Sequence, residues 1–171
     1  MTVIAGIAHQ GSVYLSGDRG ASDGDSILSM TTPKISKVGD FVIGYAGSGG
    51  LGQIVKHLEC WTRHPKNPEK FLRNDFVEEY QTARAKIGGK DEEEATLLIG
   101  YKGVLWEIDT SDYACFPFAY TAIGSGGPIA LGSLYATKNS PISPELRLNA
   151  AINAAIEHNP GCKGPIDTLF C

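Results

Sequence analysis

The β-prone runs of this chain come in closely spaced pairs, and this pairing constrains the fold more than any other feature of the sequence. Val3–Ala8 and Ser12–Gly17 flank a short polar turn, as the strands of a β-hairpin do. The stretches "PKISKVGDFVIGYAG" and "ATLLIGYKGVLWEID" repeat the pattern, with turns at Gly39-Asp40 and Lys102-Gly103. Because hairpins join antiparallel neighbours, we expect the sheets to be mostly antiparallel.

Helical patterns separate these hairpins, and they also come in pairs. Apolar residues at helical spacing predict a first helix over Leu51–Trp61. A second helix begins at Asn67-Pro68 and ends at the charged stretch "GGKDEEE", which we expect to be a solvated loop. A third is expected from about Ser125 to Ala136, and a fourth begins at Ser143-Pro144-Glu145, an order that helix starts favour. The stretch "PIDTLFC" predicts a last strand.

This order of elements predicts an α+β fold. Two helix pairs and two sets of hairpins fit a four-layer αββα sandwich, with helices outside and sheets inside. A chain of 171 residues, of which 42% are hydrophobic and 20% charged, suits one globular domain over residues 1–171.

The composition argues against several classes of partner and site. The net charge of −4 disfavours nucleic acid or an acidic membrane surface as a partner. The sequence shows neither a signal-peptide pattern nor an apolar run of about 20 residues, so we expect a cytoplasmic protein with no membrane partner. The four cysteines lack C-x-x-C spacing, so we expect buried or idle thiols and neither a disulfide framework nor a metal site. We also expect no cofactor.

Two glycine-rich motifs resemble known ligand sites without meeting their requirements. "GSGGLG" satisfies G-x-G-x-x-G, but its helix runs into a second helix, not into the parallel strand of a dinucleotide-binding unit. "IGSGGP" holds Ser125, but Ile123 stands where a nucleophile elbow requires glycine. Both motifs are therefore interpreted as tight turns between a strand and a helix.

Thr2 is the candidate nucleophile. An N-terminal threonine can supply both the hydroxyl that attacks a carbonyl and the α-amine that takes its proton. Such an amine has an ordinary pKa of about 7.7–8.0, so a useful fraction is neutral near pH 7. Removal of Met1 frees this amine, and the β-prone run directly after Thr2 predicts a rigid position for it.

The run "TVIAGIAHQGSVYLSGDRGASDG" resembles the start of the proteasome β-type family, especially the bacterial HslV peptidases. "TPKISKVGDFVIGYAG" and "AIGSGGPIA" are similar to later signatures of the same family, at matching distances from Thr2. The resemblance covers nearly the whole chain. It implies the αββα sandwich of the N-terminal-nucleophile (Ntn) hydrolases, in agreement with the order of elements described above.

The resemblance implies five catalytic residues. Thr2 is the nucleophile, and Asp18 orients Lys34 and balances its charge. The positive charge of Lys34 lowers the pKa of the threonine hydroxyl and amine. Gly44 supplies a backbone N–H to the oxyanion, and Ser125 hydrogen-bonds the amine end and its proton-shuttling water.

The same resemblance implies how a substrate lies. Ser22 and Ala46 bracket an extended peptide by main-chain pairing, so that the peptide becomes an added strand. Asp167 takes the place of the acid that proteasome β-subunits hold near the amine. Val3 is a departure from the family pattern, which usually has a second threonine at this position.

The expected function is that of a threonine endopeptidase that acts on polypeptide substrates inside a ring-shaped homo-oligomer. The resemblance also implies an unfolding ATPase as a partner. Two alternatives stay open at this point. The first alternative is an inactive ring or scaffold subunit that retains Met1. The second is a non-proteolytic Ntn amidohydrolase, because a fold does not determine which substrate is cleaved.

Overall fold

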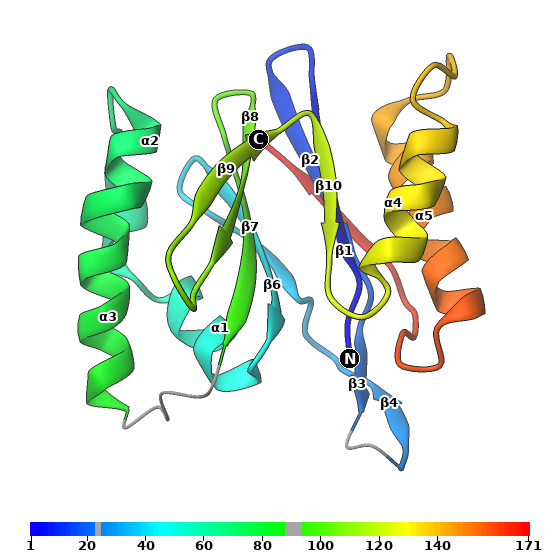
Figure 1. Ribbon diagram of the computed structural model, residues 1–171, viewed down its shortest axis with the longest axis horizontal. Helices are drawn as coiled ribbons and strands as arrows, with labels where there is room; N and C mark the ends of the chain where they lie inside the picture. The colour runs from blue at the N-terminus through cyan, green and yellow to red at the C-terminus, as the bar shows by residue number, and fades with distance from the viewer. Residues whose placement is uncertain (23–24, 88–93) are drawn as a thin grey trace.

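Two β-sheets lie face to face in the middle of the molecule and are covered by helices on both outer sides (Figure 1). The computed structural model describes residues 1–22, 25–87 and 94–171. One outer layer holds α4 (Gly127–Ala136) and α5 (Pro144–His158). The other holds α1 (Gly49–Lys56), α2 (Pro68–Phe71) and α3 (Val77–Lys86). The predicted α+β, four-layer αββα sandwich is confirmed.

The strand pairs of both sheets are antiparallel wherever the structure describes them, as the hairpin pattern predicts. One sheet has the order β10-β1-β2-β11, with β10 at Tyr120–Ile123, β1 at Ile4–His9, β2 at Ser12–Gly17 and β11 at Asp167–Phe170. The other has the order β5-β6-β7-β8-β9, with β5 at Ile35–Val38, β6 at Phe41–Gly47, β7 at Ala95–Tyr101, β8 at Val104–Asp109 and β9 at Cys115–Phe118. A separate small ribbon pairs β3 (Gly20–Ser22) with β4 (Ile27–Ser29).

Tight turns fix the register of two hairpins. Gln10 and Gly11 connect β1 to β2 with φ angles of 48° and 82°, and Lys102 and Gly103 connect β7 to β8 with 47° and 76°. Turns with two successive positive φ angles match the right-handed twist of the strands that they join. The tips of the two hairpins touch, because a Cβ at Gly103 would lie 2.8 Å from the backbone of Gly11. The two sheets therefore meet at the end of the molecule opposite the N-terminus (Figure 1).

The helix starts follow the capping pattern in the sequence. Asn67 Oδ1 accepts a hydrogen bond from Lys70 N at 3.0 Å, and Ser143 Oγ accepts one from Leu146 N at 3.4 Å. Each cap thereby satisfies one of the free N–H groups of its first turn, and proline follows each cap directly.

The first predicted helix is wrong in its length. It ends at Lys56, and a separate 3-10 turn covers Glu59–Thr62. Trp61 belongs to this turn, yet it is buried and its Nε1 donates to Val55 O at 2.6 Å. The apolar spacing that predicted one long helix therefore reflects two elements that pack against the same core.

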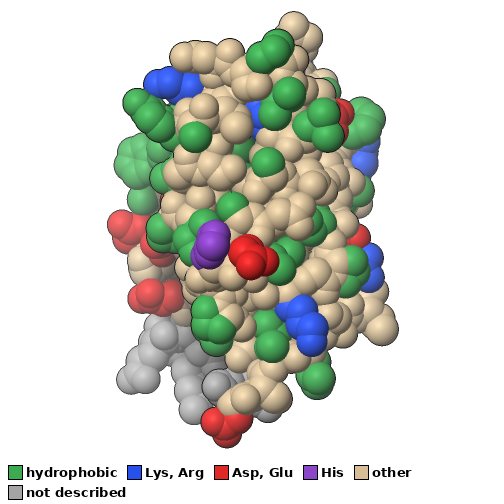
Figure 2. Space-filling model, turned by 90° about the vertical axis from the view of Figure 1, so that its right-hand side faces the viewer, with side chains coloured by type: hydrophobic (Ala, Val, Ile, Leu, Met, Phe, Trp, Pro, Cys, Tyr) green, Lys and Arg blue, Asp and Glu red, His purple; other side chains and the backbone are tan. Residues whose placement is uncertain are grey.

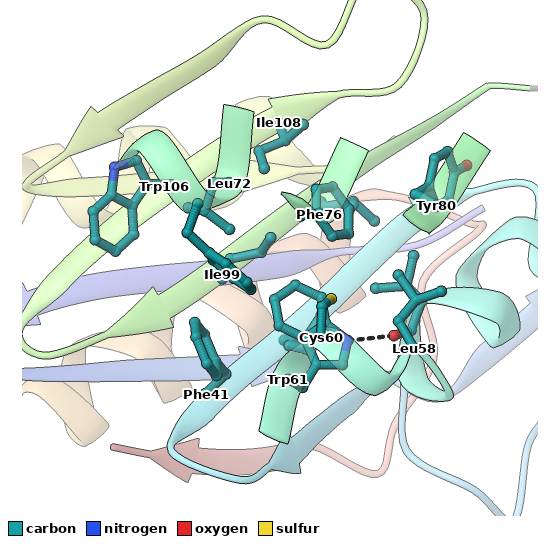
Figure 3. Close-up of a cluster of buried hydrophobic side chains, with 14 of the residues drawn as sticks. Phe41, Leu58, Cys60, Trp61, Leu72, Phe76, Tyr80, Ile99, Trp106 and Ile108 are labelled. Atoms are coloured by element: carbon teal, nitrogen blue, oxygen red, sulfur yellow. Dashed lines mark hydrogen bonds between the residues drawn. The ribbon is translucent and has the colours of Figure 1, made fainter. Parts of the chain in front are cut away.

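Each interface between layers has its own hydrophobic core. Figure 3 shows the aromatic-rich core between β6–β8 and the helices α1–α3, where Phe41 packs against Trp61 at a ring-centroid distance of 5.0 Å. Leu134, Leu148 and Ile152 lie between α4, α5 and the first sheet. The core between the two sheets is built from aliphatic residues, among them Ile4, Leu15, Val42 and Leu98.

The fold contains three short strands beyond those that the sequence predicts. The strands β3, β4 and β9 were not predicted, and each has only three or four residues. The expected charged loop "GGKDEEE" lies, except for Glu94, outside the described residues.

Within the described ranges, no helix combines the length and apolarity needed to cross a bilayer. Figure 1 places the N-terminus, the β3–β4 ribbon and the loop between β10 and α4 at one end of the sandwich.

Candidate active site

The residues around Thr2 hold its backbone in a fixed position. Thr2 O accepts a hydrogen bond from Gly126 N at 3.1 Å, and Thr2 N donates to Ser125 Oγ at 3.3 Å. Gly124 has a φ of +85°, and a Cβ at this residue would lie 2.3 Å from Thr2 O. Only glycine therefore allows the 124–127 turn to approach Thr2 this closely. The "IGSGGP" motif, which the sequence indicates as a turn, therefore contacts the candidate nucleophile directly.

Asp18 lies directly behind Thr2 and is fully buried. Its Oδ1 accepts from Val3 N at 3.0 Å and from Lys34 Nζ at 2.7 Å. Its Oδ2 accepts from Gly20 N at 2.9 Å and from Lys163 N at 3.0 Å. These four donors compensate a buried carboxylate for the water that it has lost. Asp18 thus links the N-terminal strand to the segment that precedes β11.

Lys34 connects this carboxylate to the candidate nucleophile. Its side chain is 4% exposed, and Nζ lies 2.9 Å from Thr2 Oγ1 and 3.2 Å from Met1 O. Thr2 Oγ1 in turn donates to Met1 O at 2.7 Å. The three N–H donors of the Lys34 ammonium group can therefore be satisfied by Asp18 Oδ1, Thr2 Oγ1 and Met1 O. The structure therefore brings Thr2, Asp18, Lys34 and Ser125 together, although they lie up to 123 residues apart in the sequence.

Two hollows meet at Thr2, and both are lined by Met1, Thr2 and Gly47. The first, of about 190 Å³, is lined further by Ala21, Ser22, Met30 and Tyr45, with Lys34 beside Thr2, and we call it the apolar hollow. The second, of about 300 Å³, contains Glu94 and Asp109, and we call it the acidic hollow. The surroundings of the Thr2 hydroxyl are therefore apolar on one side and acidic on the other.

An open strand edge runs beside the two hollows. Strand β6 pairs with β5 only as far as Gly44, whereas its pairing with β7 continues to Gly47. In the part of the chain that the structure describes, Tyr45, Ala46 and Gly47 therefore have no strand partner on the β5 side. Ala46 lies in this stretch and lines the acidic hollow, and Ser22 of β3 lines the apolar one. The apolar hollow therefore lies between β3 and the end of β6.

Two curated proteins and two solved structures show which fold holds this site. No family model matches the chain. The chain is 26% identical over 165 residues to a proteasome subunit beta of Frankia casuarinae, covering 90% of this chain and 60% of that protein. A proteasome subunit beta of Frankia alni is 25% identical over 183 residues, covering 98% of this chain and 66% of the relative. The chain thus spans less than two thirds of the length of these curated relatives.

Solved structures give a longer match. The structure of Thiobacillus denitrificans BPH in complex with epoxomicin superposes with a TM-score of 0.81 at 20% identity, over 99% of this chain and 98% of that one. The eukaryotic HslV of Trypanosoma brucei superposes with a TM-score of 0.74, again at 20% identity and over 99% and 98% of the two chains. The chain has a proteasome β-type, HslV-like fold.

Within this HslV-like fold, Gly44 does not lie where the sequence-based hypothesis required an oxyanion donor. It is a central residue of β6, with Ile35 of β5 on one side and Leu98 of β7 on the other. A Cβ at Gly44 would meet Ile4 Cγ2 at 2.9 Å, so this glycine permits close packing of the two sheets. Gly44 lines neither of the hollows at Thr2, so we no longer expect it to be the oxyanion donor.

Gly47 is the glycine of β6 that borders the nucleophile, and sequence reasoning missed it. Its φ is +111°, and a Cβ there would lie 2.4 Å from Glu94 O. A side chain is therefore excluded both by backbone conformation and by space. The signal was present in "GYAGSGG", since this glycine marks the strand end that faces both hollows.

Asp167 has a different partner from the one that the resemblance implied. Its Oδ1 and Oδ2 accept from Arg19 Nη2 at 2.6 Å and Nε at 2.7 Å. The hydrogen bond of Thr2 N goes instead to Ser125 Oγ. Pairing with Asp167 raises the pKa of Arg19 further above its ordinary value. Asp167 therefore holds Arg19 in a bidentate ion pair at the start of β11.

The cysteines of this fold are not poised for nucleophilic chemistry. Burial raises the pKa of the Cys60 thiol to about 12 and that of Cys115 to about 11. Burial also raises the pKa of Cys162, which adjoins the site. A thiol must lose its proton to react. Thr2 is therefore the better candidate nucleophile, and the described residues contain no cluster of metal-ligating side chains.

Proposed function

We propose that this chain is a threonine peptidase that hydrolyses peptide bonds with Thr2 as its nucleophile, once Met1 has been removed. The observation that supports this proposal is the contact of Lys34 Nζ with both Thr2 Oγ1 and Asp18 Oδ1, at 2.9 and 2.7 Å. A buried ammonium ion beside a hydroxyl favours loss of the hydroxyl proton. The position of this hydroxyl where two hollows and an open strand edge meet gives a peptide carbonyl access to it.

In the proposed reaction, the free amine of Thr2 takes the proton of Oγ1 while Oγ1 attacks the carbonyl carbon of the scissile bond. The negative charge then develops on the carbonyl oxygen, and the N–H of Gly47 is the proposed donor to it. The tetrahedral intermediate collapses as the leaving nitrogen receives the proton from the amine of Thr2. Water, deprotonated by the same amine, hydrolyses the resulting ester and restores Thr2.

Met1 has a direct bearing on this chemistry. While Met1 is attached, the nitrogen of Thr2 belongs to a peptide bond and its lone pair is delocalised, so it cannot accept a proton. Met1 O also accepts hydrogen bonds from both Thr2 Oγ1 and Lys34 Nζ, the two groups that a substrate carbonyl must approach. A chain that retains Met1 is therefore expected to be the inactive scaffold subunit, the second candidate function.

The proposal includes assembly into a ring-shaped homo-oligomer in the cytoplasm, with an unfolding ATPase as a partner, as the resemblance implies. Figure 2 shows hydrophobic side chains scattered over the face of α4 and α5, with a histidine and an acidic side chain near its centre. Leu131, Tyr135 and Leu146 contribute to it and are 40%, 60% and 60% exposed. Large exposed apolar side chains that gather on one face favour a protein contact there.

The test combines intact-mass measurement of the N-terminus with hydrolysis of a mixture of reporter peptides. Chains that lack Met1 are expected to hydrolyse peptides, and Thr2→Ala is expected to abolish turnover while the assembly keeps its size. Thr32→Ala, at an exposed threonine outside both hollows, is the matched control and keeps normal turnover. Turnover by the Thr2→Ala variant at the normal rate contradicts the proposal. Loss of Met1 without any peptide hydrolysis favours the amidohydrolase alternative.

A further inference from the structure

The acidic hollow has a composition that general peptide binding does not require. Beyond Thr2 and Gly47 its wall is made of Met1, Ala46, Glu94, Ala95, Thr96, Asp109, Gly124 and Ser125, and removal of Met1 opens it further toward Thr2. Thr96 of β7 and Asp109 of β8 are direct cross-strand partners, so the hollow opens at the edge where these strands meet the loop that precedes α4. Among the described residues that line it, Glu94 and Asp109 have the only ionisable side chains.

The two carboxylates differ in how they are held. Asp109 is half-buried, and its Oδ1 accepts from Ser111 N at 2.8 Å and from Ser111 Oγ at 2.7 Å. Its position is therefore fixed before any ligand enters. Glu94 is exposed at the rim of the same hollow. A fixed inner carboxylate and a rim carboxylate bring two negative charges to the hollow, whose described wall has no lysine or arginine and only the α-amine of the N-terminal residue as a positive group.

The hollow differs from an acidic surface patch because the candidate nucleophile forms part of its wall. Thr2 and Gly47 are shared with the apolar hollow, so a peptide that presents a carbonyl to Thr2 Oγ1 places neighbouring side chains near both hollows. This step rests on the proposed function. We infer that the acidic hollow selects a basic side chain, lysine or arginine, next to the scissile bond and disfavours aspartate and glutamate there.

The physical basis is the attraction between unlike charges in a partly enclosed space. A lysine or arginine side chain in the hollow keeps its apolar stem against Ala46 and brings its charged end to Asp109 and Glu94. A carboxylate in the same place meets two like charges and has no described cationic side chain of the wall to pair with. Screening by salt weakens both effects, which gives the inference a second signature.

The experiment uses peptides that carry a single Lys, Leu or Glu at each position near the scissile bond. Binding is measured by fluorescence anisotropy on the Thr2→Ala chain, where no hydrolysis intervenes, and kcat/KM is measured on the Met1-free chain. We expect the Lys peptide to bind about five- to tenfold more tightly than the Leu peptide at one position, and the Glu peptide to bind most weakly. The preference is expected to shrink when the salt concentration rises.

Asp109→Asn and Glu94→Gln keep the shape of each side chain and remove its charge. Each is expected to reduce the preference for Lys over Leu by about two- to fivefold, with Asp109→Asn the larger effect because that carboxylate is fixed. Asp112→Asn removes the same charge from an exposed residue of the β8–β9 connection outside the hollow. This control is expected to leave the preference unchanged.

The two arms separate this inference from the proposed function. Lys-selective binding that Asp109→Asn reduces and Asp112→Asn does not supports the acidic hollow as a cation-selective subsite, even if no peptide is hydrolysed. In that last case the peptidase proposal fails and the subsite stands. Equal binding of Lys, Leu and Glu peptides at every position overturns the inference, whether or not hydrolysis occurs. An equal loss of preference in Asp112→Asn overturns it as well, since it assigns the effect to net charge.

Discussion

Lys34 Nζ lies 2.7 Å from Asp18 Oδ1, and this ion pair is almost completely withdrawn from solvent, with the two side chains 4% and 0% exposed. The same ammonium group reaches Thr2 Oγ1 at 2.9 Å. A buried ion pair is weak evidence for stability, because the desolvation of both charges offsets their attraction. Its position behind a hydroxyl suits a chemical role better than a structural one.

Lys34→Met is expected to lower the rate of peptide hydrolysis at least about 100-fold, because the charge that favours the deprotonated hydroxyl is lost. The variant also leaves Asp18 with three backbone donors and no counter-charge. We therefore expect a loss of about 3 kcal/mol in the free energy of unfolding as well. Single-turnover hydrolysis and chemical denaturation measure the two effects.

Lys34→Arg separates charge from geometry. It keeps the positive charge, but a planar guanidinium does not place that charge where a compact ammonium lies. The variant is expected to recover more stability than activity relative to Lys34→Met. Near-normal hydrolysis by Met1-free Lys34→Met would remove Lys34 from the mechanism.

Gly47→Ala is expected to damage both folding and activity. The substitution adds a Cβ that would lie 2.4 Å from Glu94 O, at a residue with a φ of +111°. Gly50→Ala is the matched control, since its Cβ meets only Ser48 Oγ at 3.9 Å and the residue lies within α1. We expect Gly50→Ala to be neutral or to stabilise by about 0.5–1 kcal/mol. Thermal unfolding and kcat measure the contrast, and equal effects of the two variants contradict the special role of Gly47.

The fold could be predicted from the sequence because its signals are local. Hairpins such as β7–β8 depend on residues that are adjacent in the chain, and the caps at Asn67 and Ser143 lie within one turn of the N–H groups that they satisfy. The strands β3, β4 and β9 escaped prediction because three or four residues carry little pattern. Their pairing is fixed by neighbours, and β9 contains Pro117, which disfavours a strand assignment.

The site was predictable only in part, for the same reason. The positions of Thr2, Asp18 and Lys34 followed from a resemblance, and their contacts agree with it. The hydrogen bond from Lys163 N to Asp18 Oδ2 joins residues 145 positions apart, and no pattern in the sequence around either residue predicts it. The resemblance assigned the oxyanion role to Gly44, and the sequence alone does not show that Gly47, three residues later in the same strand, is the glycine that faces both hollows.

Stability is expected to fall at alkaline pH because of Cys60. Burial raises the pKa of its thiol from 9.0 to about 12, so the folded chain holds a proton that the unfolded chain releases. A raised folded-state pKa gives stability that is complete below about pH 9 and is lost as the pH rises towards 12. The loss approaches about 1.4 kcal/mol per pH unit for one thiol between these limits.

The measurement is the denaturation midpoint as a function of pH for the wild type and Cys60→Ala. The variant is expected to be less stable at pH 8 because of the cavity, but to lose stability less steeply above pH 9. If the denaturation midpoints of the two proteins fall equally with pH above 9, the Cys60 thiol is not the cause of the alkaline loss of stability. Labelling by a thiol reagent gives an independent check, because the partly exposed Cys171 should react before the buried Cys60.

The last prediction concerns the ion pair of Arg19 and Asp167, for which the resemblance and the structure give different roles. Arg19 also donates from Nη1 to Thr31 O at 2.6 Å, and Met30 N donates to Arg19 O at 2.8 Å. The pair therefore ties the segment around β3 and β4, which borders the apolar hollow, to β11. If this is its role, Asp167→Asn loosens the substrate edge and raises KM more than it lowers kcat.

Arg19→Lys completes the test of that pair. It keeps the charge but cannot form two parallel hydrogen bonds to one carboxylate, so it should resemble Asp167→Asn in raising KM. If Asp167 instead acts on the amine of Thr2, Asp167→Asn lowers kcat strongly and shifts the pH dependence of kcat, while Arg19→Lys leaves kcat nearly unchanged. Parallel KM effects in the two variants assign Asp167 to positioning. A loss of kcat in Asp167→Asn alone assigns Asp167 to proton transfer at the Thr2 amine.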